Sequence, residues 1–118
     1  KDIEISHSNI LIMGFSFKEN CPDHRNTRVV DIYEKLVSYK SNVDIFDPWV
    51  DIDEVERDYG LVLFNELPKR KYDSIIIAVA HNEFIDMHID QYFKLLNKNH
   101  VIFDIKSILD KKYTDSRL

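Results

Sequence analysis

Glycine is scarce in this chain of 118 residues, which contains only Gly14 and Gly60. A dinucleotide-binding Gly-x-Gly-x-x-Gly loop and a P-loop both need several glycines, because their backbones must approach phosphate groups closely. The sequence therefore excludes both loops. NAD binding in the usual Rossmann manner is not expected of this chain.

Other scarcities narrow the class of protein. A single cysteine, Cys21, excludes an internal disulfide and suits a reducing cytoplasm. No apolar run approaches about twenty residues and no signal peptide is evident, so a membrane span or an export route has no support. The formal net charge of −5 argues against nucleic acid and against anionic membrane surfaces. A local site for one diphosphate still needs only about two or three cations.

The sequence does contain an alternation of strand and helix patterns. Short apolar runs rich in branched residues predict strands at residues 10–13, 43–46, 61–64 (an edge strand), 74–80 and 101–104. Apolar spacing and capping signals predict helices at residues 28–40, 52–59 and 81–96, the last broken or bent near His88. This order implies the α/β class, with a doubly wound, mostly parallel Rossmann-like sheet of about five strands in a single domain.

The ends of the chain are expected to lie outside this domain. We expect residues 1–8 to form a linker or the end of a connecting helix, residues 9–110 the domain, and residues 111–118 a polar, frayed tail. Because the chain begins at Lys1 without an initiator Met, we also expect it to be a piece of a longer protein.

A polar loop follows the first predicted strand at Gly14 and carries Lys18 and Arg25. In open α/β sheets, ligands lie beyond the carboxyl ends of the strands, so both cations lie where a ligand is expected. A lone loop cation is more often a solvated side chain or a member of an ion pair, here with Glu19 or Asp23.

Four residues nevertheless form a coherent set. Phe17 offers an apolar face, Lys18 a compact cation and Arg25 a forked donor, while Lys106 is a cation after the last strand. Together they suggest an anion-binding rim at the carboxyl edge of the sheet.

Several other polar residues have ordinary interpretations. Cys21 has no base tied to it in sequence, so we interpret it as a packed loop residue and assign no catalytic residue. Cys21 and His24 have a metal-like spacing that His81 could complete in space, but two candidate ligands are too few, and we assign no metal. Asp47 occupies a position where Rossmann domains often contact a ribose, yet it also suits a turn before a proline.

Two further features are interpreted as structural. His81 is a polar residue at a strand end, beside Asn82 as a helix cap. The basic triplet at residues 69–71 is a solvated turn, since it lacks the interleaved aromatic residues of a nucleic-acid patch.

Four motifs of the chain resemble, in order, those of one protein family. They are GFSFKENCPDHRNT at residues 14–27, DIFDPWVD at 44–51, AHNEF at 80–84 and FDIKSIL at 103–109. They are similar to the C-terminal, UDP-binding domain of the UDP-glucose/GDP-mannose dehydrogenase family. The branch they resemble most oxidises UDP-N-acetylhexosamines to uronic acids for bacterial surface polysaccharides, as in Vi-antigen and capsule biosynthesis.

The resemblance implies roles for the rim residues. Phe17 and Lys18 would contact the UDP-sugar, and Lys106 would occupy a position where glucose-using relatives usually carry Arg, without its bidentate geometry. Arg25 would reach NAD bound mainly by an N-terminal domain that this chain lacks. The family's nucleophilic cysteine would lie in a missing middle segment, so the chain alone would be an inactive part of an NAD-dependent UDP-sugar 6-dehydrogenase.

The resemblance also implies partners. These are a UDP-sugar, the N-terminal NAD-binding domain of the same chain and a second copy in a homodimer, all in a bacterial cytoplasm, with no nucleic acid and no membrane. A hypothesis from another class stays open at this point: a non-catalytic nucleotide-binding or dimer-assembly α/β module.

Overall fold

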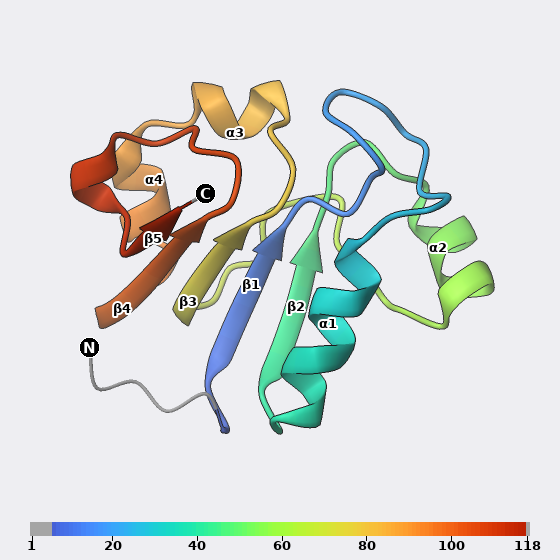
Figure 1. The fold of residues 1–118 in the computed structure, drawn as a ribbon, viewed down its shortest axis with the longest axis horizontal. Helices are drawn as coiled ribbons and strands as arrows, with labels where there is room; N and C mark the ends of the chain where they lie inside the picture. The colour runs from blue at the N-terminus through green and yellow to red at the C-terminus, as the bar shows by residue number, and fades with distance from the viewer. Residues whose placement is uncertain (1–5, 118) are drawn as a thin grey trace.

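The computed structural model describes residues 6–117, which form a parallel sheet with helices on both of its faces (Figure 1). The strands are β1 (Asn9–Met13), β2 (Asn42–Phe46), β3 (Tyr72–Ile77), β4 (Leu96–Asp104) and β5 (Ser116–Arg117). The helices are α1 (Val29–Ser38), α2 (Ile52–Tyr59), α3 (Asn82–Asp86) and α4 (Ile89–Phe93), with a 3-10 turn η1 at Lys111–Tyr113.

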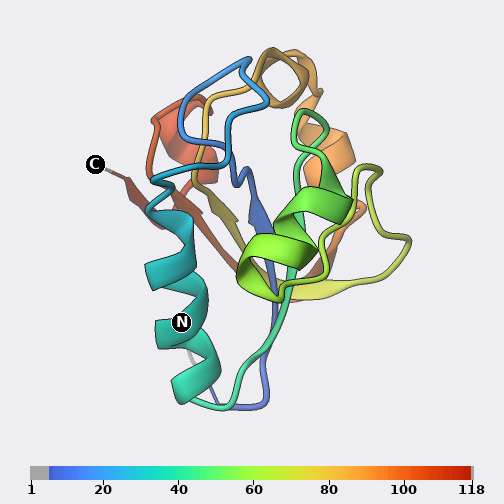
Figure 2. The same cartoon turned by 90° about the vertical axis from the view of Figure 1, so that its right-hand side faces the viewer.

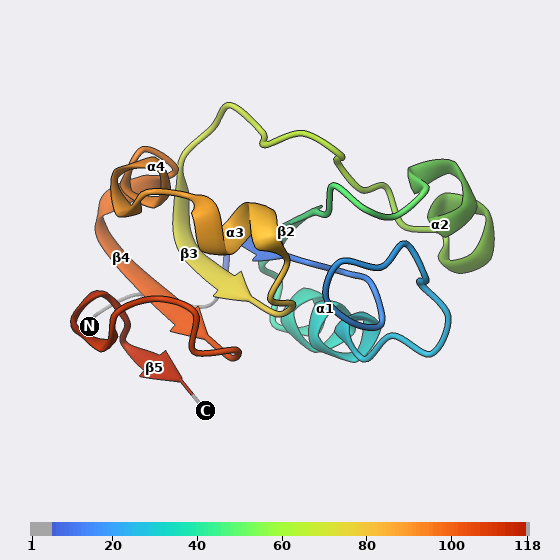
Figure 3. The same cartoon turned by 90° about the horizontal axis from the view of Figure 1, so that it is seen from above.

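The sheet has the strand order β2-β1-β3-β4-β5, and every neighbouring pair is parallel. The chain first runs outward from β1 to β2 and then returns past β1 to β3, so the crossovers use both faces. Figure 3 shows α1 and α4 on opposite sides of the sheet, and Figure 2 shows α1 running alongside the strands. Val55 of α2 packs in the same buried cluster as Val29 of α1. The predicted α/β class and doubly wound sheet are confirmed.

Alternate residues of the central strands fill two separate cores, because successive side chains of a strand point to opposite faces. Leu11 and Met13 pack with Ile75, Ile77 and Ile102 beneath α3 and α4. On the other face, Ile12 and Ile45 pack with Val29 of α1. Both faces of β1 are therefore buried, as its continuous apolar run predicts.

The predicted ends of the helix at 52–59 and the predicted break near His88 are both confirmed, because capping groups close in sequence set them. The carboxylate of Asp51 accepts hydrogen bonds from the N–H groups of Asp53 and Glu54 and starts α2, and Gly60 ends it with φ of 72°. The predicted break near His88 separates α3 from α4, since the His88 side chain accepts from Asp90 N–H and caps α4. The cap of α3 is His81, one residue before the predicted Asn82.

Two predictions about the sheet edges were wrong. Residues 61–64 make only one bridge, between Phe46 and Phe64. Phe64 exchanges backbone hydrogen bonds with Ile45 and Asp47, and the Asn65 side chain then donates to the carbonyl groups of Asp47 and Val50. The tail beyond Asp110 is not frayed: it contains η1 and β5, and the N–H of Asp115 donates to Ile102 O at 2.9 Å.

The predicted linker at residues 1–8 lies largely outside the described residues, so its boundaries stay a prediction. Across residues 6–117, no helix has both the length and the apolar character that a membrane crossing requires.

Candidate functional site

The carboxyl ends of β1, β2 and β3 meet at one edge of the sheet, where the loop after β1 lies close to α3 (Figure 1). Gly14 begins that loop with φ of 104°. A Cβ atom on Gly14 would lie 2.6 Å from Val79 Cβ, so a larger residue would collide with the segment that follows β3. Glycine is needed here both for its backbone angle and for the close approach.

A small cavity of about 190 Å³ opens at this edge. Its lining comes from the β1–α1 loop, the start of α1, the end of β3 and the segment after β4, namely Ser16, Phe17, Lys18, Glu19, Thr27, Arg28, Val29, Ala78, Val79 and Lys106. The structure thus brings Phe17, Lys18 and Lys106 together, although Lys106 is far from the other two in sequence.

The electrostatic character of the cavity is mainly positive. The side chains of Lys18, Arg28 and Lys106 are exposed and make no ion pair with any residue that the structure describes, whereas Glu19 supplies one negative charge. The N-terminus of α1 also faces the cavity, since Val29 lines it. The positive end of the helix dipole adds to the charge of the three cations, so this arrangement suits an anion.

Sequence reasoning missed two of these residues, Thr27 and Arg28. The Thr27 hydroxyl donates to Phe15 O, and Thr27 Oγ1 accepts from Val29 N–H at 3.2 Å, which joins the loop to the start of α1. Arg28 immediately precedes the first residue of the helical apolar pattern. A cation at that position is a usable signal, because the first residues of a helix after β1 face the ligand edge.

Arg25 is not part of this cavity. It lines a neighbouring hollow of about 450 Å³ beside α2, and its side chain is 80% exposed. Its Nε donates to Asp23 Oδ1 at 3.0 Å, and this hydrogen bond contributes most to lowering the pKa of Asp23 to about 2. In this structure, Arg25 is paired with Asp23 at the surface, and its predicted contact with NAD stays a prediction.

Behind the cavity, Asp47 is completely buried at the end of β2. Its Oδ2 accepts hydrogen bonds from Phe15 N–H at 2.7 Å, from Ser16 N–H at 3.0 Å and from His81 Nε2 at 2.9 Å. Burial by itself raises the pKa of Asp47, but the hydrogen bonds from His81 and from both N–H groups outweigh it, and the pKa falls below its ordinary value. Asp47 is thus an ionised carboxylate without access to solvent.

The other oxygen of Asp47 shapes the turn after β2. Oδ1 accepts from Trp49 N–H at 2.7 Å and from Val50 N–H at 3.3 Å. This is the turn-forming role that an Asp before Pro48 predicts. A ribose contact is not available to a carboxylate with 0% exposure.

His81 is also fully buried and connects three segments. Its Nδ1 accepts from Asn20 N–H at 2.9 Å, while Nε2 faces Asp47 Oδ2 at 2.9 Å and Ser16 Oγ at 3.2 Å. Because a backbone N–H can only donate, Nδ1 must carry the lone pair and Nε2 the proton. In this arrangement the imidazole is neutral.

Two aromatic rings pack against the His81 imidazole. The Trp49 ring stacks on the imidazole with centroids 6.1 Å apart, and the Phe84 ring meets it edge-on at 5.2 Å. The Trp49 indole N–H donates to Glu83 Oε1 at 2.9 Å. The His81 side chain is therefore held on both sides by apolar faces.

The residues considered for a metal lie apart in different interactions. His24 Nε2 lies 2.8 Å from Asp58 Oδ2, and His81 is occupied as described above. Cys21 is a free, half-buried thiol. In the described part of the chain, no group of three or more His, Cys, Asp or Glu residues could hold a metal ion.

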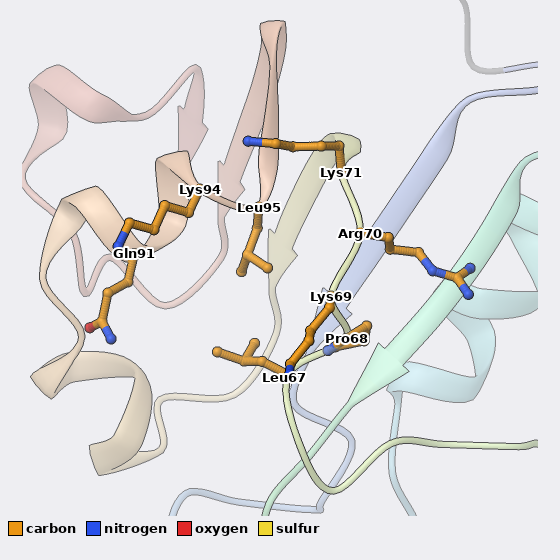
Figure 4. A pocket seen from close by; sticks show the side chains of 8 residues that line it. All are labelled: Leu67, Pro68, Lys69, Arg70, Lys71, Gln91, Lys94 and Leu95. Atoms are coloured by element: carbon orange, nitrogen blue, oxygen red, sulfur yellow. The ribbon is translucent and has the colours of Figure 1, made fainter.

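A larger hollow of about 530 Å³ lies near the amino ends of β3 and β4 (Figure 4). Its lining comprises Leu67, Pro68, Lys69, Arg70, Lys71, Gln91, Lys94 and Leu95. Figure 4 shows Arg70 pointing away from the other side chains, and its Nη1 lies 3.1 Å from Asp44 Oδ2. Residues 69–71 thus lie next to Lys94, but at the end of the strands where ligands are not expected.

Comparison with known proteins identifies the family. The family described as "UDP-glucose/GDP-mannose dehydrogenase family, UDP binding domain" matches residues 11–111. A UDP-N-acetyl-D-glucosamine 6-dehydrogenase from Salmonella typhi is 45% identical over 118 residues, which are 100% of this chain and 28% of the relative. A protein of the same name from Pseudomonas aeruginosa is 44% identical over 116 residues, covering 98% of this chain and 28% of the relative.

The fold also matches that of solved structures. The crystal structure of an NDP-N-acetyl-D-galactosaminuronic acid dehydrogenase from Methanosarcina mazei matches with a TM-score of 0.83 and 22% identity, covering 95% of this chain and 23% of that chain. The chain therefore spans only about a quarter of the length of the proteins that it matches. From its sequence match over residues 11–111, the chain belongs to the UDP-glucose/GDP-mannose dehydrogenase family and corresponds to the UDP-binding domain of that family.

Proposed function

We propose that this chain is the UDP-sugar-binding part of an NAD-dependent UDP-sugar 6-dehydrogenase of the UDP-N-acetylhexosamine type, serving bacterial surface polysaccharide synthesis. The observation that carries this proposal is the convergence of Lys18, Arg28, Lys106 and the N-terminus of α1 on one cavity. A diphosphate suits this arrangement, because its oxygens accept hydrogen bonds from cations and from helix N–H groups alike. The names of the two bacterial relatives support the choice of sugar.

Each lining residue has a role in this proposal. Phe17, which is 57% exposed, offers its ring to the uracil or the sugar. Lys18 and Arg28 bind diphosphate oxygens, and Lys106 binds an oxygen on the sugar side. Binding energy from the nucleotide, which is remote from the reacting carbon, then helps to orient the sugar for oxidation.

NAD and the nucleophile belong to the remainder of the longer protein in this proposal. The residues of this chain do not fit a dinucleotide, since Gly14 and Gly60 are its only glycines and a glycine-rich phosphate loop cannot be built from them. Arg25 would contact NAD held by the N-terminal domain. The full-length enzyme would act as a homodimer in the cytoplasm, and this chain alone would be inactive.

Titration of the chain with UDP and, separately, with NAD tests the proposal. We expect UDP to shift the backbone amide NMR signals of residues 16–19, 27–29 and 106, with uridine as a weaker control because it lacks the diphosphate. NAD should leave these signals in place. If UDP causes no saturable shift, or if NAD shifts the same residues, the proposed site is wrong.

A further inference from the structure

Asp47 and His81 are fully buried and do not line the cavity, yet both bind the backbone of the segment that carries Phe17 and Lys18. Asp47 holds the start of that segment through the N–H groups of Phe15 and Ser16. His81 holds its end through Asn20 N–H. Residues 15–20 are therefore fixed at both ends by side chains from the ends of β2 and β3.

Further hydrogen bonds restrict the backbone conformation of residues 15–20. The Ser16 hydroxyl donates to Lys18 O at 2.9 Å, and Phe17 N–H donates to Asp23 O at 2.7 Å. Asn20 has a positive φ of 56°, a conformation that non-glycine residues adopt only with support from their surroundings. That support includes the contact of its N–H with His81 and the hydrogen bond from Asn82 N–H to Asn20 Oδ1 at 2.9 Å.

The side chains of Phe17 and Lys18 have no comparable anchors. Phe17 is largely exposed, and the Lys18 ammonium makes no ion pair with any described residue. Their positions therefore depend on the backbone that carries them. A site whose backbone is held in place before binding loses less conformational entropy when the ligand arrives, and so binds more tightly.

The hydrogen-bond pattern also specifies the protonation state of His81. A proton on Nδ1 would face the N–H of Asn20, and two donors cannot bond to each other. The groups that face the imidazole are the Asp47 carboxylate, the Ser16 hydroxyl and the Asn20 N–H, with the Trp49 and Phe84 rings at its sides. The nearest other carboxylate in this network, that of Glu83, binds the Trp49 indole.

We propose that Asp47 and neutral His81 are positioning residues, which hold residues 15–20 so that Phe17 and Lys18 meet the nucleotide. This inference rests on the proposed function. It implies that UDP affinity depends on an acceptor at the position of His81 Nδ1, although His81 makes no contact with the ligand.

A series of substitutions at His81 separates positioning from simple stability. In His81→Asn, the amide oxygen can replace Nδ1 as acceptor for Asn20 N–H, whereas His81→Ala removes the acceptor and the donor together. We expect calorimetry to give at least about tenfold weaker UDP binding for His81→Ala, and recovery to within about threefold of wild type for His81→Asn.

Tyr92→Phe is the matched control for lost stability. Tyr92 is also fully buried, and its hydroxyl donates to Phe84 O at 2.7 Å, away from residues 15–20. We expect this variant to unfold at lower urea concentration than wild type but to bind UDP normally. Should His81→Ala, measured where it is folded, bind UDP as tightly as Tyr92→Phe does, the positioning role is wrong.

Rescue by His81→Asn is the readout that stability alone would not move, because it restores the acceptor for Asn20 N–H without restoring the imidazole. Equal losses of UDP affinity in His81→Asn and His81→Ala would overturn the inference, whereas a wild-type chain that binds no UDP would overturn the proposed function as well.

Discussion

The two ends of the sheet both carry exposed cations around a hollow, but among the described residues they differ in the groups that hold the backbone beneath those cations. At the carboxyl edge, Lys18 and Lys106 border a cavity of about 190 Å³, and the backbone that carries Lys18 is held by Asp47 and His81. At the amino edge, Lys69 and Lys94 border a hollow of about 530 Å³, whose polar lining residues are all exposed.

The difference lies in how the backbone beneath the cations is held, which neither the volume of a hollow nor its charge describes. A lysine side chain loses rotamer freedom when it binds a ligand, and a mobile backbone beneath it adds to that loss. Where buried hydrogen bonds already fix the backbone, the ligand does not have to order it, so binding costs less conformational entropy. The smaller hollow is therefore the better candidate, and the predictions below test this comparison.

Substitution of Asp47 should have the largest effect. In Asp47→Ala, the buried N–H groups of Phe15, Ser16 and Trp49 lose their acceptor, so the free energy of unfolding should fall by at least about 3 kcal/mol. Asp51→Ala is the matched control, because Asp51 is an exposed helix cap whose loss costs about 1 kcal/mol. Urea denaturation measures both, and equal losses would contradict the comparison.

The Asp47 variant also has an expected pH dependence. Because the folded-state pKa of Asp47 is lowered, its carboxylate stabilises the fold above the ordinary Asp pKa, about 3.9, and this contribution is lost as the pH falls through the folded value. The difference in stability between wild type and Asp47→Ala should therefore narrow in acid. A constant difference down to about pH 2 would show that folding does not lower the pKa of Asp47, and a difference that widens in acid would show that folding raises it.

Substitution of the two glycines tests how closely the carboxyl edge is packed. Gly14→Ala brings a Cβ to 2.6 Å from Val79 Cβ at a φ of 104°, and we expect a loss of about 3 kcal/mol. Gly60→Ala has φ of 72° but nothing within 4 Å of the added Cβ, so backbone strain alone should cost about 1 kcal/mol. Chemical denaturation would contradict this account if Gly60→Ala proved the more harmful change.

Substitution of Lys18 addresses affinity rather than stability. Lys18→Ala should weaken UDP binding about tenfold, since one charge-assisted hydrogen bond to a phosphate is lost. Cys21→Ser is the control from the same loop, and we expect UDP affinity close to wild type. Calorimetric titration showing the reverse order would remove Lys18 from the site.

The smallest effect is expected at the amino edge. The double variant Lys69→Ala/Lys94→Ala removes two cations from the larger hollow, yet UDP affinity should stay within about twofold and stability within about 0.5 kcal/mol of wild type. A tenfold loss of UDP binding in this variant would mean that the nucleotide binds at the amino edge, and that the comparison between the two ends is wrong.

Much of the fold could be predicted, because its signals are local. The predicted helix at 52–59 matches α2, since an Asp cap and a Gly stop act within a few residues. The edge strand predicted at 61–64 was wrong, because only Phe64 of this apolar run bridges to β2, and such pairing is a tertiary contact that a local pattern does not specify. Likewise, β5 pairs with β4 in a tail whose composition indicates no order.

The candidate site was predictable only in part. Phe17 and Lys18 follow a strand directly, and Lys106 follows the last one, so the rule that ligands bind beyond carboxyl ends selects all three. Arg28 was not predicted as a site residue, because it was interpreted as the first residue of the predicted helix at 28–40. The sequence left Asp47 as either a turn residue or a ribose contact and His81 as a polar residue at a strand end, and their shared contact with residues 15–20 was not foreseen.

By itself, the sequence determined the alternation of strands and helices, the positions of Gly14 and Gly60, and the membership of the family, because periodicity, turn chemistry and motif order are properties of neighbouring residues. Only the tertiary structure decided which cations share a cavity and which polar groups support it. The His81 and Asp47 side chains meet across 34 residues of sequence, and Ser16 and His81 across 65. Such contacts depend on strand order and burial, which bring distant residues together only once the sheet has formed.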